Sequence, residues 1–335
     1  MGEIKLYDRD TIQKDINKLR EEGCNIWSIS RLNNYNTCPR QYYLTYIEHA
    51  KQKQGIYSFL GSALHSDYED LYSGVTDKLT PNHFSEDWLK AEIFSINFPS
   101  NNIKNNYKKD LDFCYKHYNK MNGGKFLCEL GFILKIDEKN YMTGFIDLIE
   151  FLGDNKINIY DFKSSAMFKD KKLISAARQL AIYQMAMEQL YGLEVVSNAW
   201  IMAKYSDIVI GDYKPIIAVQ NKDIVKRCET TLKRFMKKKG LDSSLIDMYI
   251  AMCYSTGEFD CLPEEIKKEI KIETHIKYHV VDNECKNETI QYIKETINII
   301  EGKDKNNKEG WNCEINDFFC SNLCSFGGTY CEYKN

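Results

Sequence analysis

Apolar and polar residues alternate along two stretches near the middle of the chain, and this alternation predicts a β-hairpin. One strand is expected near Met142 to Leu152 and the other near Lys156 to Lys163, joined by the turn-forming residues 153–155 (Gly-Asp-Asn). Because the side chains of a strand point alternately to its two faces, Asp161 and Lys163 lie on the same face. The pattern therefore places a carboxylate and an amine together near a strand end.

A second carboxylate interrupts the first strand of this hairpin. Asp147 stands between the apolar residues Ile146 and Leu148. An ionised carboxylate in such a strand is costly unless it is paired or binds a cation. Two acids and a lysine that converge at strand ends can hold a divalent metal ion and polarise a phosphate. The alternative is a surface hairpin with scattered charges, because short Asp-x-Lys strings are common by chance.

The remaining periodicity predicts mostly helices, with three further strands beside the hairpin. Helices are expected over 8–22, over 28–46 with a break at Pro39, from Gly61 with His65 and Glu69 one turn apart, over 175–191 before Gly192, and over 221–239. Strands are expected over 126–136, which contains Glu129, and over 195–205 and 207–219. Residues 73–124 are a polar helical insertion broken at Pro81 and Pro99, and residues 241–310 are expected to be helical.

Length and composition limit the class of protein. With 335 residues, of which 43% are apolar, the chain can bury a core as one elaborated domain or two intimate ones. No run approaches the roughly 18 to 20 apolar residues of a membrane span, and the first residues contain no apolar signal core. We therefore expect a soluble cytoplasmic protein with no membrane partner.

The net charge of −3 means that contact with a nucleic acid has to come from local patches. The helix expected over 221–239 offers one such patch, because it is strongly amphipathic. Its apolar face consists of Ile224, Val225, Cys228, Leu232, Phe235 and Met236. Its basic face, which includes Lys233 and Arg234, is a candidate surface for following DNA phosphates. A simply solvated face is the alternative.

Twelve cysteines are many for an intracellular chain, because disulfides are disfavoured in that compartment. Seven stand alone in the sequence, which is typical of small buried residues. These seven are Cys24, Cys114, Cys128, Cys228, Cys253, Cys261 and Cys285. Near the end of the chain Cys320, Cys324 and Cys331 lie close together, and with Cys38 they make four thiolates. Four thiolates suit a structural Zn²⁺ or a [4Fe-4S] cluster, and residue chemistry leaves both open.

Several motifs in the chain resemble those of the PD-(D/E)xK nucleases, specifically the RecB-like branch. Residues 144–147 (Gly-Phe-Ile-Asp) and 161–163 (Asp-Phe-Lys) are similar to the two catalytic strands of that family. The Gly-x-x-x-His string that ends at His65 precedes them, and the Gln-x-x-x-Tyr string from Gln179 to Tyr183 follows. The motifs occur in the family's order, which makes the resemblance specific. No G-x-x-x-x-G-K-[ST] loop is present, and this excludes an ATPase or helicase as far as motifs can.

The resemblance implies an α/β, restriction-endonuclease-like αβββαβ core with a mixed sheet, helical insertions and a Cys-rich C-terminal staple. It implies a nuclease, and more narrowly an exonuclease, that hydrolyses DNA phosphodiesters with Mg²⁺ or Mn²⁺. Asp147, Asp161, the main-chain carbonyl of Phe162 and His65 would hold the metal ion. Lys163 would orient water or stabilise the transition state, and Glu129 sometimes joins the site in this family. Gln179 and Tyr183 would place the DNA strand.

A second string resembles the N-terminal signature of the iron-sulfur members of this branch, which include AddB subunits and CRISPR adaptation nucleases. This string is Ser-x-Ser-x-Leu-x-x-Tyr-x-x-Cys-Pro-x-x-Tyr and ends at Tyr42. The resemblance implies a [4Fe-4S] cluster on Cys38, Cys320, Cys324 and Cys331. The spacing of the last three departs from the usual one, and Cys313 is the substitute ligand.

These patterns give an expected domain division and a set of partners. We expect a nuclease core over 1–220, a helical extension over 221–312 and a cluster-binding tail over 313–335 that packs against the Cys38 region. DNA is the expected partner, as single strands or duplex ends, with a helicase, annealing or recombination protein as a further partner. Repair, recombination, phage DNA processing and CRISPR adaptation stay open as pathways. A catalytically silent DNA-binding scaffold on the same fold and a zinc-stapled binding module are the rival functions.

Overall fold

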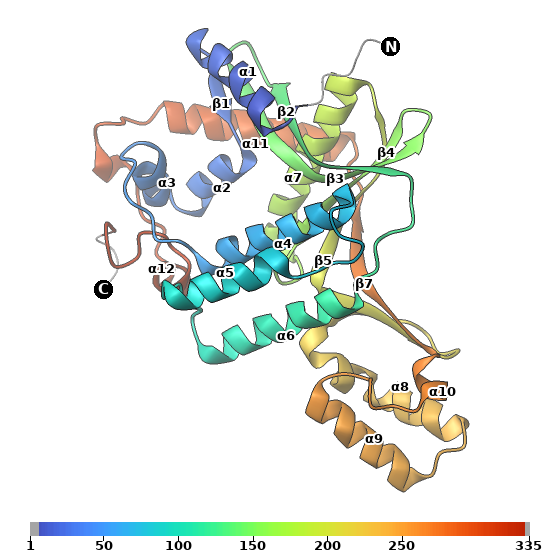
Figure 1. Cartoon of the computed structure of the whole chain (residues 1–335). Coiled ribbons are helices and arrows are strands. Elements are labelled where there is room, and N and C mark those ends of the chain that lie inside the picture. The colour runs from blue at the N-terminus through green and yellow to red at the C-terminus, as the bar shows by residue number, and fades with distance from the viewer. Residues whose placement is uncertain (1–6, 332–335) are drawn as a thin grey trace.

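A mixed, seven-stranded sheet runs through the computed structural model, which describes residues 7–331 (Figure 1). The strand order is β1-β3-β4-β5-β6, with β2 also paired to β3 and β7 to β5. The strands are β1 Asn25–Trp27, β2 Lys125–Lys135, β3 Asn140–Gly153, β4 Lys156–Lys163, β5 Glu194–Ile210, β6 Ile216–Gln220 and β7 Ile270–His279. The pairs β1–β3 and β4–β5 are parallel and the others antiparallel. The predicted α/β fold class with a mixed sheet is confirmed.

Helices cover the two faces of the sheet and extend from one end of it (Figure 1). They are α1 Arg9–Glu21, α2 Ile29–Thr37, α3 Pro39–Tyr46, α4 Ile56–Ser73, α5 Asn82–Ile93, α6 Asn101–His117, α7 Asp170–Tyr191, α8 Ile224–Lys238, α9 Ser243–Thr256, α10 Glu264–Lys267, α11 Asn283–Glu301 and α12 Asp317–Asn322, with single turns of 3₁₀ helix at Asn221–Asp223 and Lys308–Gly310. Local signals set several helix ends. Ser28 caps α2, Pro39 opens α3, and Gly192 ends α7 in the left-handed conformation.

The predicted hairpin forms, and its alternation separates two cores. On one face of β4, Ile157 and Ile159 join the cluster that includes residues of α7. On the other face, Tyr160 and Phe162 join the cluster built from α4, α5 and α6. Each such buried side chain contributes about 1.5–3 kcal/mol through burial. The two cores fix β4 between α7 and α4, so residues at the end of β4 have a defined position.

Residues 270–279 correct one expectation from the sequence. The segment 241–310 was expected to be helical throughout, but β7 lies within it and pairs with β5. Its sequence, Ile-Lys-Ile-Glu-Thr-His-Ile-Lys-Tyr-His, alternates apolar and polar residues in the way a half-buried strand does. The surrounding charges obscured that alternation. The flanking parts of the segment, α9, α10 and α11, are helical as expected.

Two further boundaries differ from the predicted ones. The strands expected over 195–205 and at the start of 207–219 are one long strand, β5, because its pairing with β7 shifts register between Met202 and Ser206 instead of the chain turning. The helix expected to start at Gly61 begins at Ile56, which places Gly61 inside α4. A Cβ at Gly61 would lie 3.6 Å from Ser164 Oγ, so α4 passes close to the end of β4.

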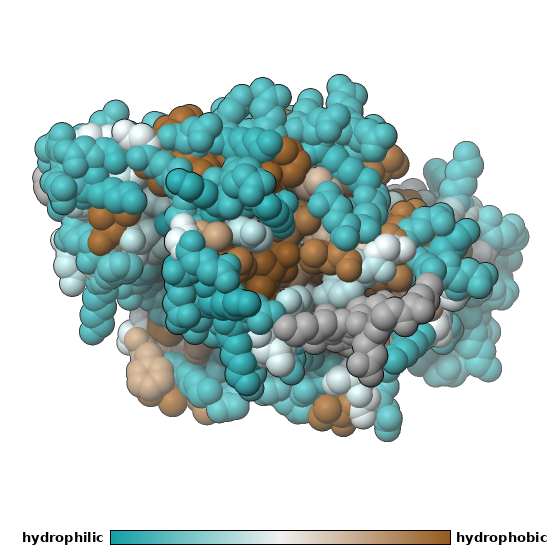
Figure 2. All heavy atoms as spheres, turned by 90° about the horizontal axis from the view of Figure 1, so that it is seen from above, coloured by the Kyte–Doolittle hydropathy of each residue, from teal (hydrophilic) through white to brown (hydrophobic). Residues whose placement is uncertain are grey.

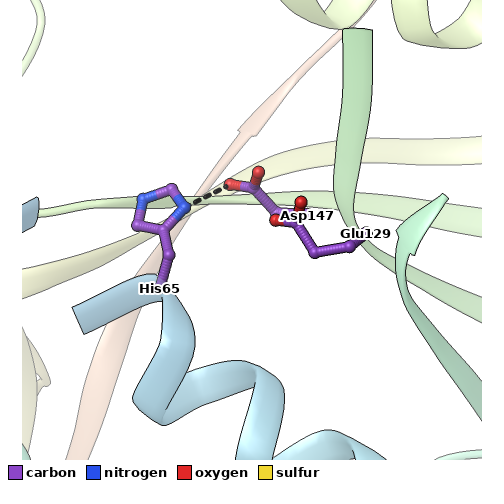
Figure 3. A group of neighbouring side chains, drawn as sticks. All are labelled: His65, Glu129 and Asp147. Atoms are coloured by element: carbon purple, nitrogen blue, oxygen red, sulfur yellow. Dashed lines mark ion pairs between the residues drawn. The ribbon is translucent and has the colours of Figure 1, made fainter. Parts of the chain in front are cut away.

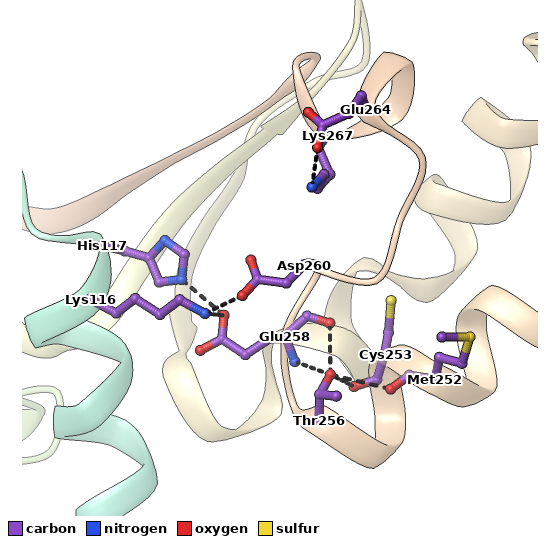
Figure 4. Close-up of polar contacts among 9 residues, drawn as sticks. All are labelled: Lys116, His117, Met252, Cys253, Thr256, Glu258, Asp260, Glu264 and Lys267. Atoms are coloured by element: carbon purple, nitrogen blue, oxygen red, sulfur yellow. Dashed lines mark hydrogen bonds and ion pairs between the residues drawn. The ribbon is translucent and has the colours of Figure 1, made fainter.

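A lobe built from α8, α9 and α10 has its own apolar core at one end of the sheet (Figure 1). The six residues predicted for the apolar face of α8 are the ones buried there. Lys116 and His117 of α6 bind this lobe through Asp260 and Glu258 (Figure 4). In the same lobe Cys253 Sγ lies 3.4 Å from Cys261 Sγ, so these two cysteines, which stand alone in the sequence, are neighbours in the fold.

The outer surface is largely hydrophilic. Viewed from above, which is the end of the molecule at which α1 lies, hydrophilic residues dominate and hydrophobic ones gather in a hollow near the middle (Figure 2). Within residues 7–331, no helix combines the length and the apolar character needed to cross a membrane. Apolar side chains are instead used in the four clusters between sheet and helices.

Candidate active site

Asp147, in the middle of β3, is the centre of a polar group on the α4 side of the hairpin (Figure 3). Its side chain is about one-tenth exposed. Asp147 Oδ2 accepts the main-chain N–H of Phe162 at 2.8 Å and lies 3.4 Å from His65 Nδ1. Burial raises the pKa of Asp147, but the charges of His65 and Lys163 outweigh burial and leave that pKa lowered. The carboxylate is therefore held in its ionised form by neighbouring cations.

Helix α4 supplies His65 to this group. The ring of Tyr68, one turn further along α4, stacks on the ring of Phe162 with centroids 4.1 Å apart. This stack fixes α4 against β4, so that the His65 ring also meets Phe162 edge-on. Burial lowers the pKa of His65, but the carboxylates of Asp147 and Asp161 together outweigh burial and leave it raised. The resemblance assigned His65 to this site, and the structure places it there.

Asp161 and Lys163 lie together at the end of β4, as the alternation predicted, and form a buried ion pair. Lys163 Nζ lies 2.5 Å from Asp161 Oδ2, and the two side chains are 21% and 1% exposed. Burial raises the pKa of Asp161 to about 6 despite the nearby lysine. Burial lowers the pKa of Lys163, but the charges of Asp161 and Asp147 leave it raised. Lys163 is therefore fully protonated and positively charged, and the carboxylate beside it, that of Asp161, is protonated more easily than an ordinary aspartate.

Gln179 connects this ion pair to α7. The amine of Lys163 donates a hydrogen bond to Gln179 Oε1 at 3.1 Å, and Gln179 Nε2 donates to the hydroxyl of Tyr183 at 2.6 Å. Tyr183 itself is only 5% exposed. Of the two residues that the resemblance assigned to DNA placement, Gln179 thus touches the lysine and Tyr183 is reached through Gln179. Their contacts position Lys163.

Glu129 completes the group from β2, and its backbone is unusual. It is in the left-handed region with φ +52°, a conformation that costs about 1–3 kcal/mol for a residue with a side chain. In this conformation its carboxylate points toward Asp147 (Figure 3). Burial and the charge of Asp147 raise the pKa of Glu129, against the lowering effect of Arg9. Such strain is typical of functional sites.

The donor set fits a divalent cation. One ligand atom from each of His65, Glu129 and Asp147 lies within 4.8 Å of the other two. Both carboxylate oxygens of Asp161 are buried, and among residues 7–331 they have no hydrogen-bond partner, although Lys163 pairs with this residue electrostatically. Buried carboxylate oxygens of this kind are costly unless a cation binds them, and oxygen ligands are those that Mg²⁺ and Mn²⁺ prefer. The fit rests on the chemistry and closeness of these residues.

Sequence reasoning missed Arg9 of α1. Its Nη2 lies 3.1 Å from Glu129 Oε2, although 120 positions separate the two residues in the chain. No motif surrounds Arg9, so the sequence holds no signal for this contact. Lys233 and Arg234, by contrast, lie on α8, apart from α4 (Figure 1). Lys233 is already paired with Glu229 at 3.1 Å and with Asp247 at 3.2 Å.

The cysteines from the two ends of the chain meet in one small cavity away from these acids. Its lining includes Cys38, Cys313, Cys320, Cys324 and Cys331. Cys313 Sγ lies 3.9 Å from Cys38 Sγ and 3.9 Å from Cys331 Sγ. The C-terminal segment is tied to the region around Cys38 by main-chain bonds from Arg40 to Asn312 and from Lys53 to Ser325. The substitute ligand named from the sequence, Cys313, thus lies 3.9 Å from two other cysteine sulfurs of the group.

Comparison with known proteins gives one finding. The family model described as the PD-(D/E)XK nuclease superfamily matches residues 26–335 of the chain. No curated protein matches the sequence. The matched residues contain Glu129, Asp147 and Asp161, which together are called the acid group, as well as Lys163, Gln179 and all five clustered cysteines. Helix α1 with Arg9 lies outside them.

Proposed function

The chain belongs to the PD-(D/E)XK nuclease superfamily, and from this premise we propose that it is a divalent-metal-dependent exonuclease of DNA in the RecB-like branch. The observation that carries the proposal is the convergence of His65, Glu129 and Asp147 beside the Asp161–Lys163 pair. Recombination, repair and phage DNA processing are the processes that such an activity serves. The cleavage reaction is the hydrolysis of a phosphodiester bond.

The residues would divide the reaction between them. Asp147, Asp161 and Glu129, with His65 and the main-chain carbonyl of Phe162, would hold Mg²⁺ or Mn²⁺, which lowers the pKa of a bound water and offsets charge on the phosphate. Lys163 would stabilise the negative charge that grows on the phosphate oxygens. Its amine is preorganised for this role, because Asp161 and Gln179 hold it at 2.5 and 3.1 Å. Glu129 and Asp147 keep the local charge negative enough to attract the cation.

Digestion of end-labelled DNA tests the proposal. Single-stranded, linear duplex and covalently closed circular DNA are incubated with the protein and Mg²⁺ or Mn²⁺. An exonuclease degrades the strands that have ends and leaves the closed circle intact. Nicking or linearisation of the circle would overturn the exonuclease assignment. Binding of DNA without any cleavage would favour the rival function of a silent scaffold.

We predict that Mn²⁺ stabilises the protein more strongly as the pH rises. Asp161, with its pKa raised to about 6 by burial, is largely protonated at about pH 5 and must lose its proton to bind a cation. The raised pKa of His65 acts in the same direction, since a protonated ring cannot be a ligand. The increase in melting temperature caused by Mn²⁺ should therefore be small at about pH 5 and larger at about pH 7.5. An equal increase at both pH values would contradict the assignment, and Asp161→Asn should weaken the pH dependence.

The cysteine cavity is a second candidate site for a bound group. We propose a [4Fe-4S] cluster on four of the five cysteines, on the strength of the sequence resemblance. Zn²⁺ is the second candidate, because the two sulfur–sulfur distances of 3.9 Å are close to the ~3.8 Å edge of a tetrahedron with Zn–S bonds of about 2.3 Å. Either group would bind the tail to α3 and contribute its binding free energy to folding. In the zinc case the group would be purely structural.

We predict that α8 contributes to DNA binding away from the site. Lys233→Glu combined with Arg234→Glu should weaken DNA affinity and lower its dependence on salt, because fewer counterions are released. Affinity is measured by fluorescence anisotropy at several salt concentrations. The control is Lys294→Glu with Lys305→Glu, two exposed lysines elsewhere on the surface. An unchanged salt dependence in the α8 variant would show that the basic face of this helix is only solvated. The ion pairs of Lys233 with Glu229 and Asp247 are consistent with that alternative.

A further inference from the structure

Helix α1 is fitted tightly against β2. Gly131 donates a main-chain hydrogen bond to Tyr7 O at 2.9 Å, which ties the start of α1 to the strand. A Cβ at Gly131 would lie 2.8 Å from Ile12 Cδ1 and 3.2 Å from Tyr7 Cβ, so glycine allows this close approach without displacing its neighbours. Asp8 caps the helix, and Ile12 is buried beneath it. The backbone of Arg9, the first residue of α1, is therefore held beside the strand that carries Glu129.

The guanidinium of Arg9 lies on the outer side of the acid group. It contacts Glu129 Oε2 at 3.1 Å and lies 5.8 Å from the centre of the Phe145 ring. The Arg9 side chain is 71% exposed, whereas the Glu129 side chain is 18% exposed. Arginine has five N–H donors in a planar fork, and the contact with Glu129 uses a small part of them. The other donors face the solvent from which a substrate approaches.

The negative charge of the site favours an exposed guanidinium such as that of Arg9 beside it. Three carboxylates, those of Glu129, Asp147 and Asp161, face a substrate that is itself a polyanion. Lys163 is mostly buried and already bound to Asp161 and Gln179, so its amine serves the reacting phosphate. An exposed guanidinium at the edge of the acid group can bind a neighbouring phosphate and hold the strand in register.

We propose that Arg9 is a substrate-binding residue, which grips a DNA phosphate adjacent to the one that is hydrolysed. It would exchange Glu129 for the phosphate when a divalent cation takes up the charge of Glu129. This inference rests on the proposed nuclease function and adds a contact from a helix that lies outside the residues matched by the family. The function of α1 would then be to place the guanidinium of Arg9 at the edge of the acid group.

The test combines variants of the protein with single neutral positions in the DNA. Arg9→Ala and Arg9→Lys are compared with Arg20→Ala, an arginine on the same helix that contacts Asn17 and no residue of the acid group. A DNA series carries one uncharged methylphosphonate at each position near the end. In the wild-type protein, kcat/KM should fall about 10- to 100-fold at one position beside the cleaved bond, as expected for a lost charge-assisted bond.

Arg9→Ala should lower kcat/KM on normal DNA by a similar factor, mainly through KM, and should show no further loss at that position. Arg9→Lys should be intermediate, and Arg20→Ala unchanged. An unchanged kcat/KM in Arg9→Ala, a faster cleavage, or an undiminished methylphosphonate effect would each overturn the inference. A faster cleavage would identify Arg9 as a block on Glu129.

DNA binding in Ca²⁺ without cleavage separates this inference from the proposed function. Arg9→Ala should lower the slope of log affinity against log salt by about 1, the value for one lost phosphate contact. If Arg9→Ala lowers the slope in this way but the wild-type protein never cleaves DNA, the Arg9 contact is supported and the nuclease proposal is overturned. A wild-type protein that binds no DNA would overturn both.

Discussion

Replacement of Lys163 by Met is expected to abolish DNA cleavage, with a loss of at least ~100-fold in rate, while DNA binding stays close to that of the wild type. The Lys163 side chain is 21% exposed and its amine is held by Asp161 and Gln179, so the amine is placed for the reacting phosphate more than for the free strand. Met keeps most of the volume of the side chain and removes its charge. Single-turnover cleavage of labelled DNA and anisotropy binding measure the two quantities.

Controls for this variant come from the same strand. Lys156, at the other end of β4, pairs loosely with Glu194 at 3.9 Å, and Lys156→Met should cleave at the normal rate. Loss of Lys163 also leaves the buried Asp161 without its cation, which destabilises the metal-free protein. Thermal unfolding is therefore compared in Mn²⁺, which replaces the missing positive charge. A Lys163→Met protein that is folded and cleaves at the wild-type rate would show that the assigned site is wrong.

Replacement of Cys38 by Ala is expected to remove the bound metal group and to lower the melting temperature by on the order of 5 °C or more. The reason is that Cys38 is the one cysteine of the cavity that comes from the N-terminal half of the chain. Without it the group no longer joins α3 to the C-terminal segment. Iron, sulfide and zinc analysis of anaerobically purified protein measures the first effect, and calorimetry the second.

The matched control is Cys228→Ala, which removes a fully buried thiol of the α8 lobe. It should leave the metal content unchanged. A brown protein that dithionite bleaches supports the [4Fe-4S] cluster, and a colourless zinc protein supports the alternative. Comparison of Cys313→Ala with Cys320→Ala decides which of these two cysteines is the remaining ligand. Cys313 Sγ lies 3.9 Å from two other cysteine sulfurs, whereas the Cys320 thiol contacts the main-chain oxygen of Glu314. Full metal retention in Cys38→Ala would contradict the proposed site.

Features that depend on neighbouring residues could be predicted from the sequence. The alternation in β4 placed Asp161 and Lys163 together, and the periodicity of α8 gave its buried face without error. Both follow from the fixed geometry of a strand or a helix, in which side-chain direction depends on position alone. His65 needed the resemblance, because a single histidine on a helix carries no local signal for a metal site.

Features that depend on tertiary contacts could not be predicted in this way. The approach of Glu129 to Asp147 requires a positive φ that its local sequence does not indicate. The contact between Arg9 and Glu129 depends on the space left at Gly131, and the choice between Cys313 and Cys320 depends on how the tail folds over α3. Strand β7 has a local alternation, but its place in the sheet depends on pairing with β5, about 70 residues earlier in the chain.

The dependence of DNA cleavage on Mn²⁺ concentration tests the central claim most directly. With end-labelled DNA and the wild-type protein, we predict no products in the presence of a chelator and a rate that rises with Mn²⁺ to a plateau. Asp161→Asn, which keeps the shape of this buried side chain and removes its charge, should give no products at any Mn²⁺ concentration. Equal cleavage with and without the chelator, or cleavage by Asp161→Asn at the wild-type rate, would contradict a metal-dependent nuclease site at these residues.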